Sequence, residues 1–167
     1  MTNPEVETIR ILNAEIANWK FDDFVRNLTE GVVITPNVDH MILLQKDREF
    51  YDNYAEAEHI VCDSRILYFL SKFLYPGRGL ADQIAGSDLF PAYCQHHKDD
   101  TESVRILILG GTESSIELTR TAINKKAGSE LVIAAYSPPF GFEHNPEETQ
   151  KIIQLAEECR ATVMAIG

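Results

Sequence analysis

The sequence has few of the residues on which metal and redox chemistry depend. Its three cysteines, Cys62, Cys94 and Cys159, are an odd number at no metal-ligand spacing, so we predict reduced thiols without a chemical role. The five histidines form no H-x-x-x-H or H-E-x-x-H pattern, and no Asp-x-Asp pair ends an expected strand. We therefore predict no metal site and no cofactor. The G-x-G-x-x-G pattern is also absent, which disfavours NAD binding.

Basic side chains and long apolar runs are scarce as well. Fifteen Lys and Arg stand against 26 Asp and Glu, giving a formal net charge of −11, which repels nucleic-acid backbones, so we expect no nucleic-acid partner. No run approaches the roughly 20 apolar residues of a membrane span, and the first ten residues lack the apolar stretch of a signal peptide. We expect a soluble, cytoplasmic chain forming a single domain over residues 1–167.

Short runs rich in Val, Ile and Leu alternate with amphipathic stretches along the chain. The expected strands are Ile9–Leu12, Val32–Thr35, His59–Cys62, Arg105–Leu109, Leu131–Tyr136 and Thr162–Ile166. The expected helices are Phe21–Leu28, Val38–Ala57, Ser64–Leu74, Ser87–His97, Thr112–Ala127 and Pro146–Arg160. This alternation predicts an α/β fold with a Rossmann-like, mostly parallel sheet and helices on both faces.

Polar or glycine-containing segments follow four of the expected strands, and ligands of open α/β sheets bind at this edge. The segments are Thr35–Asn37, Asp63, Gly110–Thr112 and Ser137–Gly141. We expect them to converge on one crevice. The two glycines before the helix at Thr112 permit a tight turn with free N–H groups, which suits a diphosphate, although a plain strand-to-helix turn explains them too.

Other residues at this edge allow two interpretations each. Asp63 either caps the helix Ser64–Leu74 or serves as a general base whose pKa is raised by burial. Thr35 and Asn37 flank a proline, so they form either an ordinary turn, which we favour, or a pair of ligand contacts. The helix Ser64–Leu74 is apolar on nearly all sides and forms either core, which we favour, or an oligomer contact.

The segment Ser137–Glu143, with the sequence SPPFGFE, stands out as a binding loop. Two adjacent prolines remove two backbone donors and fix φ, and Gly141 permits conformations closed to other residues, so the segment is neither helix nor central strand. Asn145 is expected to cap the helix that follows, with Pro146 in its first turn.

Four motifs, taken together, resemble the WecG/TagA/CpsF family of bacterial glycosyltransferases, with similarity from about Ile9 to the last residue. The motifs are Ile34–Asn37, Gly86–Leu89, Leu107–Gly111 and Ser137–Glu143. The resemblance implies an inverting, metal-independent enzyme. It would transfer N-acetylmannosamine or a related hexose from a UDP-sugar to a polyprenyl-diphosphate-linked N-acetylglucosamine, for surface polysaccharide or teichoic acid.

The resemblance also implies roles for individual residues. Asp63 matches the aspartate proposed as the base, which takes the proton from the acceptor hydroxyl. Gly110 and Gly111, with the helix start after them, would hold the diphosphate, and Phe140 and Gly141 would border the nucleotide. The full set of implied substrate-binding residues is Thr35, Asn37, Gln83, Gly86, Ser87, Asp88, Gly110, Gly111, Thr112, Pro139, Phe140 and Gly141.

The chain departs from the family pattern at Ser64, where glycine is usual, and at Gln83, where arginine is usual. Relatives also continue beyond the position of Gly167, into a C-terminal appendage. The resemblance implies that this appendage docks on the inner face of the plasma membrane, so we expect a truncated core that self-associates. These departures favour an alternative: a non-catalytic module that binds a UDP-sugar or a partner protein.

Overall fold

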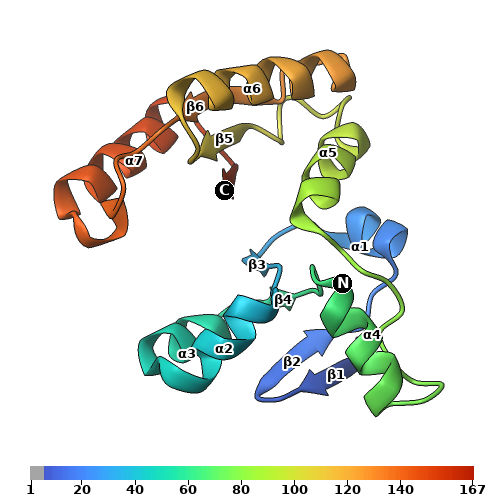
Figure 1. Ribbon diagram of the computed structural model, residues 1–167. Coiled ribbons are helices and arrows are strands. Elements are labelled where there is room, and N and C mark those ends of the chain that lie inside the picture. Colours follow the sequence, from blue (N-terminus) through green and yellow to red (C-terminus); the bar gives the residue numbers. More distant parts are fainter. Residues whose placement is uncertain (1–5) are drawn as a thin grey trace. The chain divides into compact units, whose positions relative to one another are not determined.

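The computed structural model describes residues 6–167, and its contacts group the chain into two compact units. Among the described residues, unit 1 ends at Leu89 and unit 2 is Phe90–Gly167, with the boundary inside helix α5 (Gly86–His96). The α/β class with mostly parallel strands is confirmed (Figure 1). The single domain expected over residues 1–167 stays a prediction, and each unit is described by itself.

Unit 1 begins with a hairpin that the sequence did not predict. Strand β1 (Thr8–Ile11) pairs antiparallel with β2 (Ala14–Ala17) through a turn in which Leu12 adopts a φ of 55°. Bulky residues rarely adopt positive φ, and no glycine marks this turn. The expectation that Ile9–Leu12 joins the parallel sheet is therefore wrong.

The parallel part of unit 1 consists of two short strands with helices before, between and after them. Strand β3 (Val33–Ile34) pairs with β4 (His59–Ile60). The helices are α1 (Phe21–Asn27), α2 (Val38–Lys46), α3 (Arg48–Ala55) and α4 (Arg65–Leu74). Further backbone hydrogen bonds extend the pairing beyond the strands, from Val61 N to Ile34 O at 3.0 Å and from Asp63 N to Pro36 O at 3.2 Å.

The single helix expected over Val38–Ala57 is two helices. Asp47 separates them with an extended backbone conformation, and its carboxylate accepts a hydrogen bond from Phe50 N at 3.0 Å. An aspartate that can cap the following turn competes with helix continuation. The interruption therefore follows from one N-cap residue inside an otherwise helical pattern.

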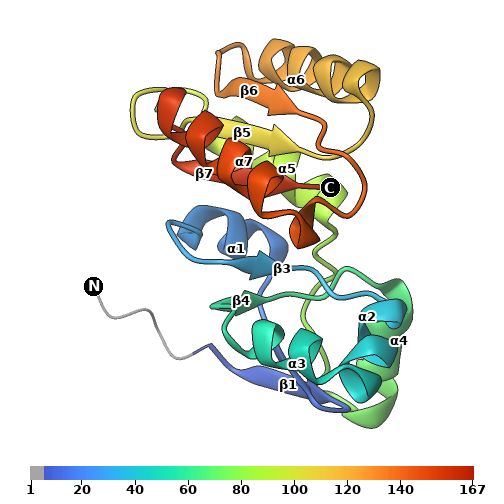
Figure 2. The same ribbon diagram turned by 90° about the vertical axis from the view of Figure 1, so that its left-hand side faces the viewer.

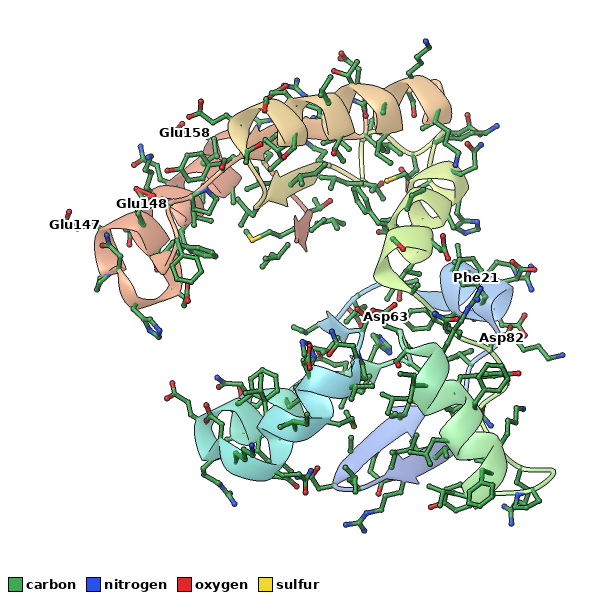
Figure 3. All side chains as sticks on the ribbon, viewed as in Figure 1. Phe21, Asp63, Asp82, Glu147, Glu148 and Glu158 are labelled. Atoms are coloured by element: carbon green, nitrogen blue, oxygen red, sulfur yellow. The ribbon has the colours of Figure 1, made fainter. Side chains whose placement is uncertain are left out.

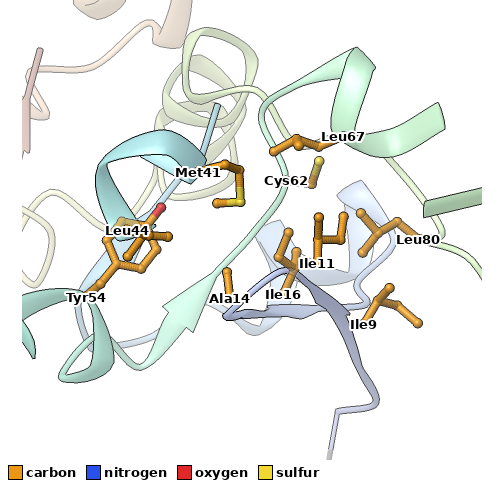
Figure 4. Close-up of a cluster of buried hydrophobic side chains, with 10 residues drawn as sticks. All are labelled: Ile9, Ile11, Ala14, Ile16, Met41, Leu44, Tyr54, Cys62, Leu67 and Leu80. Atoms are coloured by element: carbon orange, nitrogen blue, oxygen red, sulfur yellow. The ribbon is translucent and has the colours of Figure 1, made fainter. Parts of the chain in front are cut away.

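One hydrophobic cluster joins the hairpin, α2, α3, α4 and the β4 end (Figure 4). Its buried members are Ile9, Ile11, Ala14, Ile16, Met41, Leu44, Tyr54, Cys62, Leu67 and Leu80. Helix α4 contributes Leu67 to the buried members and packs its half-buried Tyr68 against them, but most of its other apolar side chains are exposed. The prediction that α4 is a core helix is therefore wrong.

Unit 2 is a three-stranded parallel sheet in the order β6-β5-β7 (Figure 2). The strands are β5 (Ile106–Leu109), β6 (Val132–Tyr136) and β7 (Val163–Ile166), connected by α6 (Glu113–Ala127) and α7 (Pro146–Glu158). Residues from α7 pack on Leu107 and Leu109. Because strand side chains alternate, Ile106 and Ile108 face the opposite side, where α6 contacts the sheet. Helices on both faces are thus confirmed for this unit.

Candidate active site

In unit 1, polar residues gather at the carboxyl ends of β3 and β4. The bond from Asp63 N to Pro36 O places Asp63 beside the Thr35–Asn37 segment. Gly86, the first residue of α5, lies against Thr35: a Cβ atom added at Gly86 would be 3.4 Å from Thr35 Oγ1. The structure therefore brings the unit 1 members of the expected site to one edge.

Asn37 has a structural role at this edge. It is the N-cap of α2, and its side-chain oxygen accepts a hydrogen bond from His40 N at 3.0 Å. The turn that we favoured for Thr35 and Asn37 is present, although only the oxygen of the Asn37 amide is used by the cap.

Asp63 does not cap the helix that follows it. The N-cap of α4 is Ser64, whose hydroxyl accepts a hydrogen bond from Leu67 N at 3.4 Å. Within residues 6–167, no donor forms a hydrogen bond with the Asp63 carboxylate. The capping interpretation of Asp63 is therefore wrong, and its carboxylate is left for another partner.

The surroundings of Asp63 change its proton affinity. Burial is the largest effect and raises the pKa of Asp63 above its ordinary value, and the Asp88 carboxylate raises it further. The charge of His40 opposes these effects only in part. A half-buried carboxylate with a raised pKa, at a strand end, binds a proton more readily than an ordinary aspartate does.

The segment Ala81–Ile84 supports the backbone of Asp63. The Gln83 side-chain amide donates to Asp63 O, and Ile84 N donates to Cys62 O at 2.7 Å. Asp82, labelled in Figure 3, accepts a hydrogen bond from Phe21 N at 2.9 Å and so caps α1. Gln83 thus acts in this structure as a support for the aspartate, and its expected contact with substrate stays a prediction.

His40 is a neighbour of Asp63 that the sequence analysis did not select. It lies in the first turn of α2, three residues after the N-cap Asn37, and its ring approaches Tyr54 Oη at 3.2 Å. Its position in the first turn of the helix that follows β3 was a signal that metal-ligand spacings alone do not reveal.

In unit 2, Gly110–Thr112 forms a tight turn from β5 into α6. Gly110 and Gly111 have φ angles of 113° and 64°, in the region that favours glycine. Thr112 is the N-cap of α6 and forms a capping box with Ser115. The turn leaves the N–H groups of the first helical residues directed out of the helix, as anion sites at helix N-termini require.

The charge near this turn is negative. Glu113 opens α6, and the segment from Ile106 to Thr119 contains no Lys or Arg. Arg120, on the next turn of the helix, is engaged by Glu117 and by Val132 O. A diphosphate bound here would rely on backbone N–H groups and the helix dipole, because no cation lies in the turn itself.

The proline-containing loop after β6 is tied to this glycine turn. The Ser137 hydroxyl donates to Gly111 O at 2.7 Å, so the two strand-end segments lie together. Phe142 packs against Leu107 and Leu109, whereas the Phe140 side chain is fully exposed at 108% of its reference area. The loop therefore has one anchoring aromatic residue and one that projects into solvent.

The helix after this loop begins as the sequence predicts. Asn145 caps α7 by accepting hydrogen bonds from Glu147 N at 3.0 Å and Glu148 N at 3.4 Å. The expected site residues thus fall into two groups: those from Thr35 to Asp88 in unit 1, and those from Gly110 to Gly141 in unit 2. Their convergence on one crevice stays a prediction.

The structure also bears on thiols, metals and membranes. Burial raises the pKa of Cys62 to about 11 and that of Cys94 to about 12, so both are protonated at neutral pH. Over residues 6–167 no three or more His, Cys, Asp or Glu side chains are grouped as metal ligands. The same residues include no helix with the length and apolar character needed to span a membrane.

A parallel α/β fold whose strands end in glycine-rich, proline-containing and acidic loops defines a class of enzymes that bind ligands at the carboxyl edge of the sheet. Within that class the chain can be placed more narrowly. The model of the glycosyl transferase WecG/TagA/CpsF family matches residues 9–167, and the chain belongs to this family. The activity of the family is sugar transfer in the synthesis of cell-surface polysaccharide. No curated protein matches the chain.

Proposed function

We propose that the protein transfers N-acetylmannosamine or a related hexose from a UDP-sugar to a polyprenyl-diphosphate-linked N-acetylglucosamine, with inversion and without a metal ion. The observation that carries this proposal is the Asp63 carboxylate, which is half-buried, raised in pKa and not used as a helix cap. Family membership supplies the reaction class, and the free carboxylate supplies the group that such a reaction needs.

In the proposed reaction, Asp63 accepts the proton of the acceptor hydroxyl while that oxygen attacks the anomeric carbon of the donor sugar. The bond between the anomeric carbon and the UDP oxygen breaks in the same displacement, so the configuration inverts. The Gln83 side chain fixes the backbone of the base by donating to Asp63 O. Ile84 N fixes the residue before it by donating to Cys62 O. The raised pKa brings the base closer to the pH at which it works.

For the donor, we propose that the diphosphate binds at Gly110, Gly111 and the start of α6. The positive end of the helix dipole would stabilise the charge that develops on UDP as it leaves. Phe140 is proposed to border the nucleotide, since an exposed aromatic ring on a proline-stiffened loop offers a preformed contact surface.

Calorimetric titration of the chain with UDP, UDP-N-acetylmannosamine and NAD, without added metal, tests the donor part of the proposal. We expect the two uridine ligands to bind and NAD not to bind. Phe140→Ala should weaken uridine binding without loss of stability, because its side chain makes no buried contact. Equal binding of NAD, or unchanged binding in Phe140→Ala, would contradict the proposed donor site.

A second candidate function is a UDP-sugar-binding module without turnover. It is favoured by the negative turn at Gly110–Glu113, because a departing diphosphate usually needs a cation. A transfer assay with a short-chain polyprenyl-diphosphate acceptor separates the two functions. Product formation supports the enzyme, whereas uridine binding without product supports the module.

The pH dependence of transfer should report the interaction of Asp63 with Asp88. The Asp88 charge raises the pKa of Asp63, so Asp88→Asn should lower it. Because the base must be deprotonated, the acidic limb of the kcat/KM profile should move to lower pH. The exposed Asp99→Asn serves as the charge-matched control and should leave the limb in place. A limb that does not move in Asp88→Asn would argue against Asp63 as the base.

A further inference from the structure

Helix α4, which follows strand β4 in Figure 1, presents a continuous apolar stripe to solvent. The stripe consists of Ile66, Phe69, Leu70 and Phe73, which are 68%, 66%, 38% and 81% exposed. Their spacing of i, i+3, i+4 and i+7 places them on one side of the helix. Soluble proteins usually expose large apolar side chains singly, whereas these four lie next to one another on one side of the helix.

The opposite side of α4 fixes this orientation. Leu67 is buried in the unit 1 cluster, and the fully buried Ser71 accepts a hydrogen bond from Leu80 N at 3.0 Å. The Ser71 hydroxyl in turn donates to Tyr68 O at 2.6 Å. The helix is therefore anchored by its other face, and the stripe is not required for the core of unit 1.

Charge around the stripe is opposite in sign to that of the chain. From Ser64 to Ala81 the only charged residues are Arg65, Lys72 and Arg78, while the chain as a whole carries −11. Arg65 and Lys72 are seven residues apart, so they lie on the same side of α4, next to the stripe. Arg78 follows in the turn after the helix and pairs with Glu7 at 3.2 Å. An apolar stripe bordered by basic residues is typical of helices that lie in a membrane interface.

We propose that α4 docks on an anionic lipid bilayer, with the stripe facing the acyl chains and Arg65 and Lys72 facing the headgroups. The charge distribution selects this occupant over a second copy of the chain. A two-fold contact through α4 would bring its basic residues close to their own counterparts, whereas an anionic bilayer complements them. The inference goes beyond the proposed function, because it concerns a surface that contains none of the proposed substrate contacts.

Flotation of the full chain with lipid vesicles, in the absence of donor and acceptor, tests the inference. We expect binding to vesicles of phosphatidylglycerol and phosphatidylcholine in equal parts, weaker binding in high salt, and little binding to phosphatidylcholine alone. Phe69→Ser/Phe73→Ser should lower the partition coefficient by roughly tenfold or more, because it removes the two largest inserted side chains. Arg65→Gln/Lys72→Gln should lower it by roughly tenfold.

Matched controls come from unit 2. Leu118→Ser/Ile153→Ser removes two exposed apolar side chains, and Lys125→Gln/Lys126→Gln removes two exposed positive charges. Both controls should bind vesicles as the unchanged chain does. Circular dichroism verifies that each variant is folded.

Three results would overturn the docking proposal: no preference for anionic vesicles, an equal loss of binding in the controls, or a dimer without vesicle affinity that Phe69→Ser/Phe73→Ser dissociates. Since no substrate is present in the flotation assay, these results are independent of whether the chain transfers sugar or binds UDP.

Discussion

Asp63→Asn is expected to lower the rate of sugar transfer by about 10²- to 10⁴-fold, the usual contribution of a general base. Uridine binding should be unchanged, because the proposed diphosphate site is the turn at Gly110 and Gly111. The fold should be retained, since Ser64 and not Asp63 caps α4. Transfer assays, calorimetry with UDP and urea unfolding of the same variant measure these three outcomes.

The same substitution has a defined effect on the pH dependence of stability. The pKa of Asp63 is raised in the folded state, so the folded chain binds this proton more tightly than the unfolded chain. Its contribution to the free energy of unfolding therefore decreases as pH rises from the ordinary carboxyl pKa through the raised one. Asp63→Asn should lack this decrease and be at least as stable as the unchanged chain at neutral pH.

Asp39→Asn is the control for both measurements, because Asp39 is a carboxylate on the first turn of α2 that lies outside the proposed machinery. It should retain transfer activity. If Asp63→Asn unfolds the chain, or if it retains full activity, then Asp63 is not the base.

Gly110→Ala is expected to destabilise the chain by about 3 kcal/mol or more. Its φ of 113° is strained for any residue with a Cβ atom, and that atom would overlap Gly167 O. Removing this overlap would require movement of Gly167, whose N–H donates to Leu109 O at 3.0 Å. Urea unfolding gives the change in free energy, and UDP titration shows whether the turn still binds.

Gly128→Ala separates backbone strain from crowding. Gly128 also has a positive φ, 76°, as the C-cap of α6, but a Cβ atom there meets nothing within 4 Å. Its substitution should cost about 1 kcal/mol, from conformation alone. If the two variants lose the same free energy of unfolding, then crowding between residue 110 and Gly167 does not affect stability.

Much of unit 2 could be predicted from the sequence. Buried parallel strands such as Ile106–Leu109 read as unbroken apolar runs, and the glycines that follow mark the turn into α6. Asn145 and Pro146 likewise specify the start of α7 by local chemistry. Local rules succeed here because each element is determined by its own residues and its immediate neighbours.

In unit 1 the same rules failed where contacts between distant residues determine the local structure. Leu12 adopts a positive φ in a hairpin turn that contains no glycine. The side chain of Asn13, next in this turn, donates to Leu44 O at 2.8 Å, in helix α2 about 30 residues further along the chain. Which aromatic residues of α4 are exposed depends on the face of the helix that packs on the core. A helix that is apolar on nearly all sides does not specify that face. The site residue His40 was missed because its significance lies in its neighbour Asp63.

The hydrogen bond between Asp82 and Phe21 determines when the proposed base, Asp63, gains its support during folding. The two residues are 61 positions apart, and their hydrogen bond fixes the segment from which Gln83 reaches Asp63. Helix α4 can form early from local contacts, but the pairing of β4 with β3 and the support of Asp63 both require distant segments to meet. The arrangement around the proposed base should therefore form late in folding, after the helices of unit 1.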